Sequence, residues 1–215
     1  MSLRGRKILV TAGPTRENWD TVRYITSRSS GKMGFAIARK AAEAGASVIL
    51  ISSVTPEGDV NGVEFAMVES AEDMFKSVKE HFKEIDIFIS SAAVSDFRPV
   101  RSITKISKSS GIPSIRLERN PDILQWAGRN RGERLLVGFS LGDIIDTGAA
   151  REKMRRKNCQ IMIANASENM GTDLRSFTVI TGKEEEHYSG ISVSTAASVI
   201  LEECENLLTD CLNCS

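Results

Sequence analysis

The feature that most constrains the fold of this chain is an alternation of strand-like and helix-like segments. Six runs rich in β-branched and other apolar residues predict strands, at Lys7–Thr11, Ser47–Ser52, Val63–Val68, Asp86–Ser90, Leu135–Phe139 and Gln160–Ala164. Helical patterns predict helices at Gly31–Ala44, Ser70–Phe82, Pro121–Arg129 and Thr147–Lys157. This alternation favours an α/β fold with a mainly parallel sheet and helices on both faces. Right-handed crossovers make such a sheet doubly wound and Rossmann-like.

Residues that favour helix ends mark several of these boundaries. Ser70 and Asp73 form a capping box, and Gly45 ends the first predicted helix. Asn120 is a candidate N-cap, and Pro121 suits the first turn of the helix that follows it. The alternation of strands and helices is therefore supported by local sequence signals as well as by apolar periodicity.

The last third of the chain differs in character. A β-hairpin is expected over about residues 176–189, turning at Gly182-Lys183, and a last helix over about residues 194–208. The segment of about residues 99–113 is expected to be a mobile flap. A length of 215 residues fits one domain, so we expect a single domain over residues 1–215.

Composition excludes several classes of partner. Lysine plus arginine and aspartate plus glutamate each number 28, so no global field attracts nucleic acid or an anionic membrane. No apolar run approaches the roughly 20 residues of a membrane span, and the N-terminus lacks the apolar segment of a secretion signal. We therefore expect a cytoplasmic protein, with reduced thiols at Cys159, Cys204, Cys211 and Cys214.

A loop rich in glycine and hydroxyl side chains connects the first predicted strand to the first predicted helix. It contains the blocks Thr11–Glu17 and Ser29–Gly34. Backbone N–H groups of such a loop, and those of the helix N-terminus, point toward a bound anion. The loop therefore indicates a phosphorylated ligand.

The common nucleotide-binding motifs are incomplete in this loop. Only Gly31 and Gly34 of a dinucleotide fingerprint are present, and no acidic residue ends the second strand to hold a ribose. Met33 stands where a P-loop has serine or threonine. A divergent NAD(P)-linked reductase is thus disfavoured, although it stays open as an alternative.

Polar residues also follow the other predicted strands. Asp96 comes after the fourth strand, and Lys105 and Lys108 lie in the flap, where a lysine can neutralise a triphosphate. Lys153 and Lys157 are four residues apart and share one helix face, which suits a polyphosphate. Simpler explanations stay open for all of them, namely a turn aspartate, a solvated basic loop and a solvated helix face.

Taken in order, these blocks resemble one family, the phosphopantothenate–cysteine ligases of coenzyme A biosynthesis, also called phosphopantothenoylcysteine synthetases. The residues that carry the resemblance are Thr11–Glu17, Val22–Ile25, Ser29–Ala38, Ala92–Arg98, Lys105–Lys108, Asn120–Leu124, Val137–Phe139, Lys153–Asn158 and Ile163–Asn165. The chain is most similar to the bacterial form, which is usually fused behind a flavin-dependent decarboxylase domain. It is either a stand-alone ligase or an excised domain.

The resemblance implies an activity. Bacterial members activate the carboxylate of 4′-phosphopantothenate with CTP, through an acyl-cytidylate, and release pyrophosphate. L-Cysteine then attacks and CMP leaves. Such a reaction brings anions together and implies Mg²⁺ and lysines around the triphosphate. The family is typically homodimeric, with the pocket completed near the interface.

The resemblance also implies roles for individual residues. It assigns catalytic roles to Lys105, Ser27 and Arg23. It assigns nucleotide binding to Ser90, Ser91, Ala92, Asp96, Lys105, Pro121, Asp122, Ile123, Leu124, Phe139, Lys153 and Lys157. It assigns binding of phosphopantothenate or phosphate to Gly13, Ser29, Ser30, Gly31, Lys32, Gly34, Ala93 and Asn165. No metal ligand is identified.

Several positions depart from the family pattern. Ser27 stands where the family usually has an asparagine that is implicated in handling the acyl-nucleotide, and Ala166 replaces a frequent aspartate. The segment Ser140–Asp143 and the flap sequence Lys105–Lys108 also differ from the usual ones. A catalytically weak or inactive dimer that binds a nucleotide or pantetheine therefore stays open, as does the choice between CTP and ATP.

Overall fold

The computed structural model of the chain describes residues 3–56, 58, 60–107, 111, 113–169 and 172–213. Its strands are β1 (Lys7–Ala12), β2 (Arg16–Asn18), β3 (Tyr24–Thr26), β4 (Ser47–Ser52), β5 (Val63–Met67), β6 (Ile87–Ser90), β7 (Phe97–Pro99), β8 (Leu117–Arg119), β9 (Leu135–Gly142), β10 (Ile161–Ala166), β11 (Leu174–Ile180) and β12 (Glu185–Ser192). Its helices are α1 (Lys32–Glu43), α2 (Ala71–His81), α3 (Ile123–Arg129), α4 (Thr147–Lys157) and α5 (Val193–Asn213). Short 3₁₀ turns lie at Phe82–Glu84 and Ser167–Asn169.

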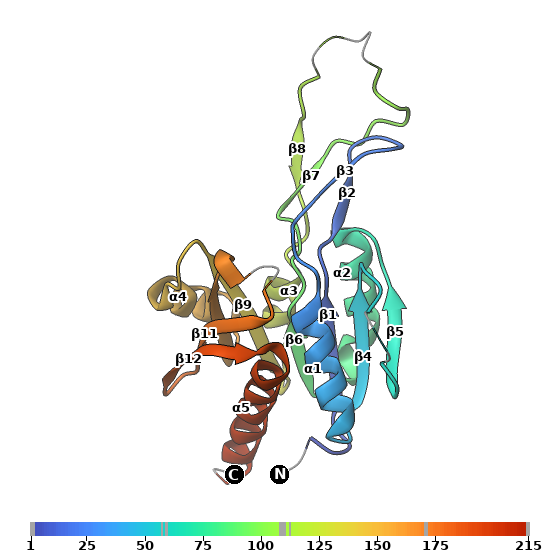
Figure 1. The fold of residues 1–215 in the computed structure, drawn as a ribbon. Helices are drawn as coiled ribbons and strands as arrows, with labels where there is room; N and C mark the ends of the chain where they lie inside the picture. Colours follow the sequence, from blue (N-terminus) through green and yellow to red (C-terminus); the bar gives the residue numbers. More distant parts are fainter. Residues whose placement is uncertain are drawn as a thin grey trace.

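Eight of these strands form the central sheet, in the order β12-β11-β10-β9-β6-β1-β4-β5 (Figure 1). The six strands from β10 to β5 are parallel, and β11 and β12 extend the sheet as an antiparallel pair. The order of the parallel strands, with β1 in the middle, is that of a doubly wound sheet. The predicted fold class is confirmed.

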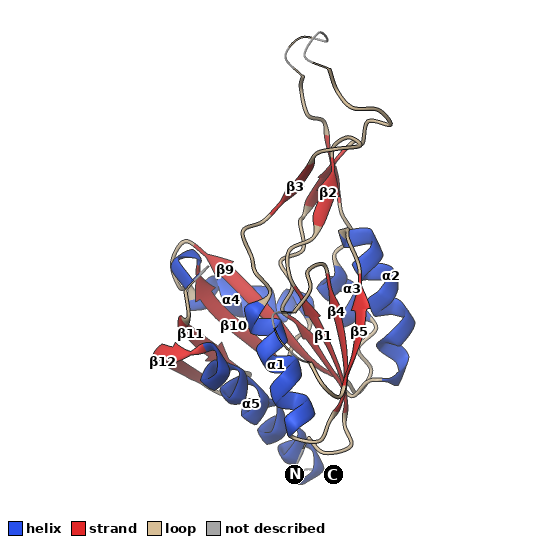
Figure 2. Cartoon of the chain, turned by 45° about the vertical axis from the view of Figure 1, so that its right-hand side comes forward, coloured by secondary structure: helices blue, strands red, loops and turns tan. Residues whose placement is uncertain are grey.

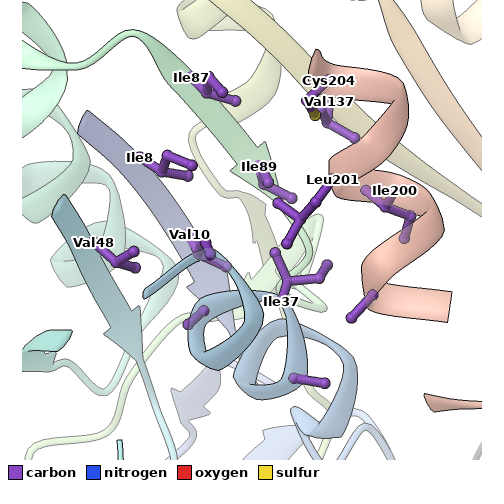
Figure 3. Packing of buried hydrophobic residues seen from close by; sticks show 14 of the residues in the cluster. Ile8, Val10, Ile37, Val48, Ile87, Ile89, Val137, Ile200, Leu201 and Cys204 are labelled. Atoms are coloured by element: carbon purple, nitrogen blue, oxygen red, sulfur yellow. The ribbon is translucent and has the colours of Figure 1, made fainter. Parts of the chain in front are cut away.

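The helices cover both faces of the sheet. On one face α1 and α5 pack against it, and Figure 3 shows Ile37 of α1 and Leu201 of α5 among sheet residues such as Val10 and Ile89. On the other face α2, α3 and α4 bury a second cluster. In the part of the chain that the structure describes, no helix combines the length and the apolar character needed to cross a membrane.

Helix ends follow the sequence in two cases out of four. Pro121, predicted in the first turn of a helix, lies outside α3, before its N-cap. The Ser70–Asp73 capping box at the start of α2 is confirmed. Gly45 is confirmed at the end of α1, where its φ of 85° suits only glycine without strain. The predicted N-cap at Asn120 is wrong, because Asp122 caps α3 by accepting the Gln125 N–H at 2.9 Å. Asn120 instead donates its side-chain N–H to Ser95 O at 2.9 Å.

Two small hairpins, β2–β3 and β7–β8, project together from the body of the molecule (Figure 2). We call residues 16–26 and 97–119 the arm. Its two halves are joined where Ser102 donates its N–H to Trp19 O at 2.8 Å and Arg23 donates to Ile106 O at 3.1 Å. The predicted flap is the connection between β7 and β8, and Lys108 lies outside the described residues.

Candidate functional site

A large cleft lies beyond the carboxyl ends of β6 and β9, which is the usual place for a ligand in a doubly wound sheet. Its volume is about 730 Å³ and α4 forms one wall, so we call it the α4 cleft. It brings together ten residues that were assigned to nucleotide binding: Ser90, Ala92, Asp96, Pro121, Asp122, Ile123, Leu124, Phe139, Lys153 and Lys157.

A second, smaller pocket lies next to this cleft, against the start of α1. We call it the loop pocket because residues 29–33 form one side of it. It brings together seven predicted residues: Ser29, Ser30, Gly31, Lys32, Ser91, Phe139 and Asn165. Phe139 lines both the loop pocket and the α4 cleft, so the two compartments meet at this residue.

The two predicted lysines of α4 face the α4 cleft and are held by hydrogen bonds. Lys153 Nζ donates to Phe139 O at 2.8 Å, and Lys157 Nζ donates to the Asp122 carboxylate. Burial lowers the pKa of Lys153, and the charge of Lys157 lowers it further. Two cations held in fixed positions near one wall can neutralise a polyphosphate with little reorganisation.

Asp122 connects these cations to the start of α3. Burial raises the pKa of its carboxyl, but the hydrogen bonds from Lys157 and from the Gln125 N–H outweigh this, and the pKa lies below its usual value. Asp122 therefore stays ionised as the N-cap of α3 and fixes the ammonium of Lys157 at the edge of the cleft.

Close backbone contacts position the loop that carries Asp96. Ala93 donates its N–H to Gly13 O at 2.9 Å, and Asn120 donates its backbone N–H to Asp96 O at 2.9 Å. Gly13 has a φ of 77°, and a Cβ there would lie 2.8 Å from a methyl carbon of Val54. Gly13 and Ala93 thus connect the ends of β1 and β6, and neither residue lines the two pockets.

The loop pocket is built around the N-terminus of α1. Gly31 is the N-cap, with a φ of 79°, and Lys32 begins the helix. Gly34 lets the helix approach β1, because a Cβ there would lie 2.6 Å from Ala12 Cβ. Within the pocket lining, the Asn165 Oδ1 atom is buried without a hydrogen-bond partner. The pocket therefore offers backbone N–H groups and an unpaired amide oxygen.

None of the three residues with predicted catalytic roles lines either pocket of a single chain, and two of them, Arg23 and Lys105, lie on the arm. Arg23 pairs with the buried carboxylate of Asp20 and stacks on Trp19, 4.4 Å from the ring centre. The hydrogen bond from Arg23 holds the pKa of Asp20 well below its usual value. Lys105 is exposed, and the third residue, Ser27, accepts a hydrogen bond from the Ser29 N–H at 3.3 Å.

The sequence analysis missed residues of β11 that line the loop pocket, namely Arg175, Ser176 and Phe177. No motif surrounds them, and only the pairing of β11 with β10 brings them near the start of α1. Residues of the arm, Phe97 and Arg119, also line the α4 cleft and were not predicted to do so.

The described residues contain no cluster of three histidine, cysteine, aspartate or glutamate side chains that would hold a metal by themselves. Mg²⁺ that arrives with a triphosphate needs only one or two protein carboxylates, because phosphate and water oxygens supply its other ligands. Asp96 is an exposed carboxylate in the lining of the α4 cleft and fits this requirement.

Comparison with known proteins gives consistent results. Residues 3–208 match the family described as the DNA/pantothenate metabolism flavoprotein C-terminal domain. The coenzyme A biosynthesis bifunctional protein CoaBC of Mycobacterium bovis is 44% identical over 179 residues, covering 76% of this chain and 42% of the relative. CoaBC of Borreliella burgdorferi is 33% identical over 204 residues, covering 93% of this chain and 52% of that relative. The chain spans about half the length of these relatives.

Solved structures agree with this assignment. The crystal structure of the C-terminal domain of a CoaBC protein superimposes with a TM-score of 0.84 at 36% identity, covering 96% of this chain and 97% of that one. A Cab2 variant in complex with phosphopantothenate-cysteine has a TM-score of 0.78 at 18% identity, covers 96% of this chain and 89% of that one, and shares the fold. The match over residues 3–208 shows that the chain belongs to the family of DNA/pantothenate metabolism flavoprotein C-terminal domains.

Proposed function

We propose that this chain is a ligase that joins 4′-phosphopantothenate to L-cysteine and uses CTP to activate the carboxylate. The observation that carries this proposal is the pair of neighbouring compartments that meet at Phe139. A reaction that joins an acid to an amine through a nucleotide must hold two large substrates with their reacting groups in contact. The family match supports the substrate class, since the relatives of this chain include coenzyme A biosynthesis bifunctional proteins.

The proposed chemistry has two steps. A carboxylate oxygen of phosphopantothenate attacks the α-phosphorus of CTP, and the bond from that phosphorus to pyrophosphate breaks. The amine of cysteine then attacks the acyl carbon of the acyl-cytidylate. The carbon–oxygen bond to CMP breaks, and the nitrogen loses a proton to give the amide. Both steps develop negative charge on phosphate oxygens, so fixed cations lower both barriers.

We assign the nucleotide to the α4 cleft. Residues 121–124 and Phe139 would hold the cytidine, and Lys153 and Lys157 would contact the phosphates. Mg²⁺ bound to the triphosphate would neutralise part of its charge, with Asp96 as the protein ligand. The balance of three acidic and four basic residues in the cleft lining suits a metal–triphosphate complex rather than a bare anion.

We assign the loop pocket to a phosphoryl group. The backbone N–H groups at the start of α1 suit an anion, and the side-chain N–H group of Asn165 would donate to it. Ser27 precedes this loop and is assigned to the neighbourhood of the acyl-nucleotide. Lys105 and Arg23 lie on the arm, so we expect them to act when the flap closes or when the arm of a second chain reaches the site.

The proposal is tested by following pyrophosphate release. We expect release only when CTP, Mg²⁺ and phosphopantothenate are all present, and formation of the cysteine amide only after cysteine is added. Replacing CTP by ATP tests nucleotide choice. If nucleotides raise the thermal stability of the protein but no combination of substrates yields pyrophosphate or amide, the chain is a non-catalytic binding protein and the ligase proposal is wrong.

We also propose that the arm forms the contact of a homodimer. Val22 and Ile103 are 63% and 91% exposed, and Tyr24, Val100 and Leu117 expose apolar surface on the same projection. Clustered exposed apolar groups are unusual on a monomer and mark interaction surfaces.

Replacing Val22 and Ile103 together by aspartate should therefore convert a dimer into a monomer at micromolar concentration. Light scattering coupled to gel filtration measures the mass. Met67→Asp, at a residue that is 54% exposed on β5 and outside the arm, is the control and should leave the dimer intact. A monomeric wild-type protein, or a double variant that still dimerises, would contradict the proposal.

A further inference from the structure

Arg175 is placed in an unusual position for an arginine. It lies on β11, it lines the loop pocket, and the whole residue is only 9% exposed. Its Nη1 atom donates to Thr172 O at 2.5 Å, to Thr172 Oγ1 at 3.0 Å and to Leu174 O at 3.4 Å, which holds one end of the guanidinium in a fixed place. Burying a permanent charge is costly, and fixed buried arginines are therefore mostly found where they bind an anion or a carboxylate.

The strand itself is irregular at this point. The register between β11 and β12 shifts between Arg175 and Phe177. Such irregularities redirect side chains and occur frequently next to ligand sites. The antiparallel hairpin at the end of the sheet thus brings a cation to a pocket whose other side is the loop before α1.

The ionisable side chains that line the loop pocket are of one sign. Among the described residues that line it, the ionisable ones are Lys32 and Arg175, and both are cationic. The N-terminus of α1 adds the positive end of a helix dipole. The α4 cleft differs, because Asp96, Asp122 and Glu152 lie among its cations. The loop pocket is therefore suited to an anion that arrives without a metal.

A carboxylate outside the lining of the loop pocket pairs with one of its two cations. Lys32 Nζ donates to Asp173 Oδ1 at 2.8 Å, and the Asp173 side chain is 86% exposed. An exposed ion pair of this kind contributes little, so an incoming phosphoryl group can replace Asp173 as the partner of Lys32.

We propose that Arg175 is a binding residue of this site and holds a phosphoryl group of one substrate in the loop pocket. This inference rests on the proposed function for the identity of the substrates. Two sources of the phosphoryl group share the same chemistry, namely the triphosphate tail of the nucleotide and the phosphate monoester of phosphopantothenate. The planar guanidinium matches either one through two N–H donors.

The test is calorimetric binding to the full chain and to Arg175→Gln. CTP is compared with CMP, and phosphopantothenate is compared with pantothenate, so that each pair differs by the phosphoryl groups in question. We expect Arg175→Gln to weaken the binding of either CTP or phosphopantothenate by about 10-fold to 100-fold. The affinity for the other member of that pair, CMP or pantothenate, should be unchanged. Arg175→Lys keeps the charge and should recover part of the loss.

Arg151→Gln is the matched control. Arg151 donates to Thr181 O at 3.1 Å, so it also contacts the C-terminal hairpin, but it lines neither pocket. Arg151→Gln should leave the affinities for CTP, CMP, phosphopantothenate and pantothenate unchanged. Equal weakening of all ligands by Arg175→Gln with a lower unfolding temperature would show a purely structural role and overturn the inference. Unchanged affinity of Arg175→Gln for all four ligands would also overturn it.

The inference and the ligase proposal fail in different ways. If the wild-type chain binds the phosphorylated ligands through Arg175 but releases no pyrophosphate, the ligase proposal fails and the phosphate-binding role stands. If the wild-type chain forms product and Arg175→Gln has wild-type affinities, the ligase proposal stands and the role of Arg175 is wrong.

Discussion

Replacing Gly128 with alanine is expected to lower the stability of the protein and its affinity for CTP together. A Cβ at Gly128 would lie 1.9 Å from Lys157 O and 3.3 Å from Asn158 Cβ, so the backbone at the end of α4 has to move. Overpacking of this kind costs about 3 kcal/mol, which corresponds to a fall of roughly 6–12 °C in the unfolding temperature of a domain of this size. Thermal denaturation followed by circular dichroism measures it.

The loss of affinity follows from the position of Lys157. Its ammonium group is fixed by Asp122 in the α4 cleft, and displacement of its backbone breaks that arrangement. Gly182→Ala is the control, because a Cβ at Gly182 meets no atom within 4 Å. An unfolding temperature of Gly128→Ala that equals that of Gly182→Ala would show that α3 and α4 are not packed as described.

The second large effect is expected from Lys153→Gln, which removes the cation that lies between α4 and the end of β9. We expect kcat/KM for CTP to fall by about 100-fold, since a fixed donor to a developing oxyanion is typically worth that much. The unfolding temperature should change little, because Lys153 makes one hydrogen bond through its ammonium group in the described contacts, to Phe139 O. Steady-state kinetics with varied CTP measures the effect.

Arg155→Gln provides the comparison for Lys153→Gln. Arg155 is exposed on the same helix and does not line the α4 cleft. Arg155→Gln therefore removes one positive charge from α4, as Lys153→Gln does, without changing the lining of the cleft. Its kcat/KM should stay within about twofold of the wild type, as expected for a surface charge. Equal effects of the two substitutions would show that α4 acts through its net charge and not through a positioned lysine.

Sequence reasoning predicted the layered body of the molecule because that body is specified by strong local patterns. The strands β1, β4 and β6 are apolar runs buried on both faces, and such runs are easily recognised. The lysines Lys153 and Lys157 were predicted to share a face by their spacing alone, and both line the α4 cleft.

The arm was not predicted because its strands carry no such pattern. Strand β3 is exposed at all three positions, as is β8, so no alternation of buried and exposed residues marks them. They are fixed instead by contacts between distant segments, such as Ser102 N–H to Trp19 O. Contacts of this kind depend on the folded arrangement and leave no local signal.

Two further differences between the sequence-based expectations and the structure also arise from contacts between distant segments. Asn120 and Asp122 are both good N-cap residues, and the choice between them depends on whether Asn120 is already bonded to Ser95 O, a tertiary contact. Arg175 reaches the loop pocket only because β11 pairs with β10 across an antiparallel connection. The sequence therefore predicts the groups on the parallel strands better than those added by the arm and the hairpin.

The meeting of the two compartments at Phe139 suggests a route to inhibitors. A molecule with one part in each compartment, tethered past the edge of Phe139, would lose its overall translational and rotational freedom once rather than twice. Such a tethered molecule should bind far more tightly than either fragment, provided that the linker spans the ring without strain. Phe139→Ala would remove the barrier between the fragments and reduce the need for a precisely shaped linker.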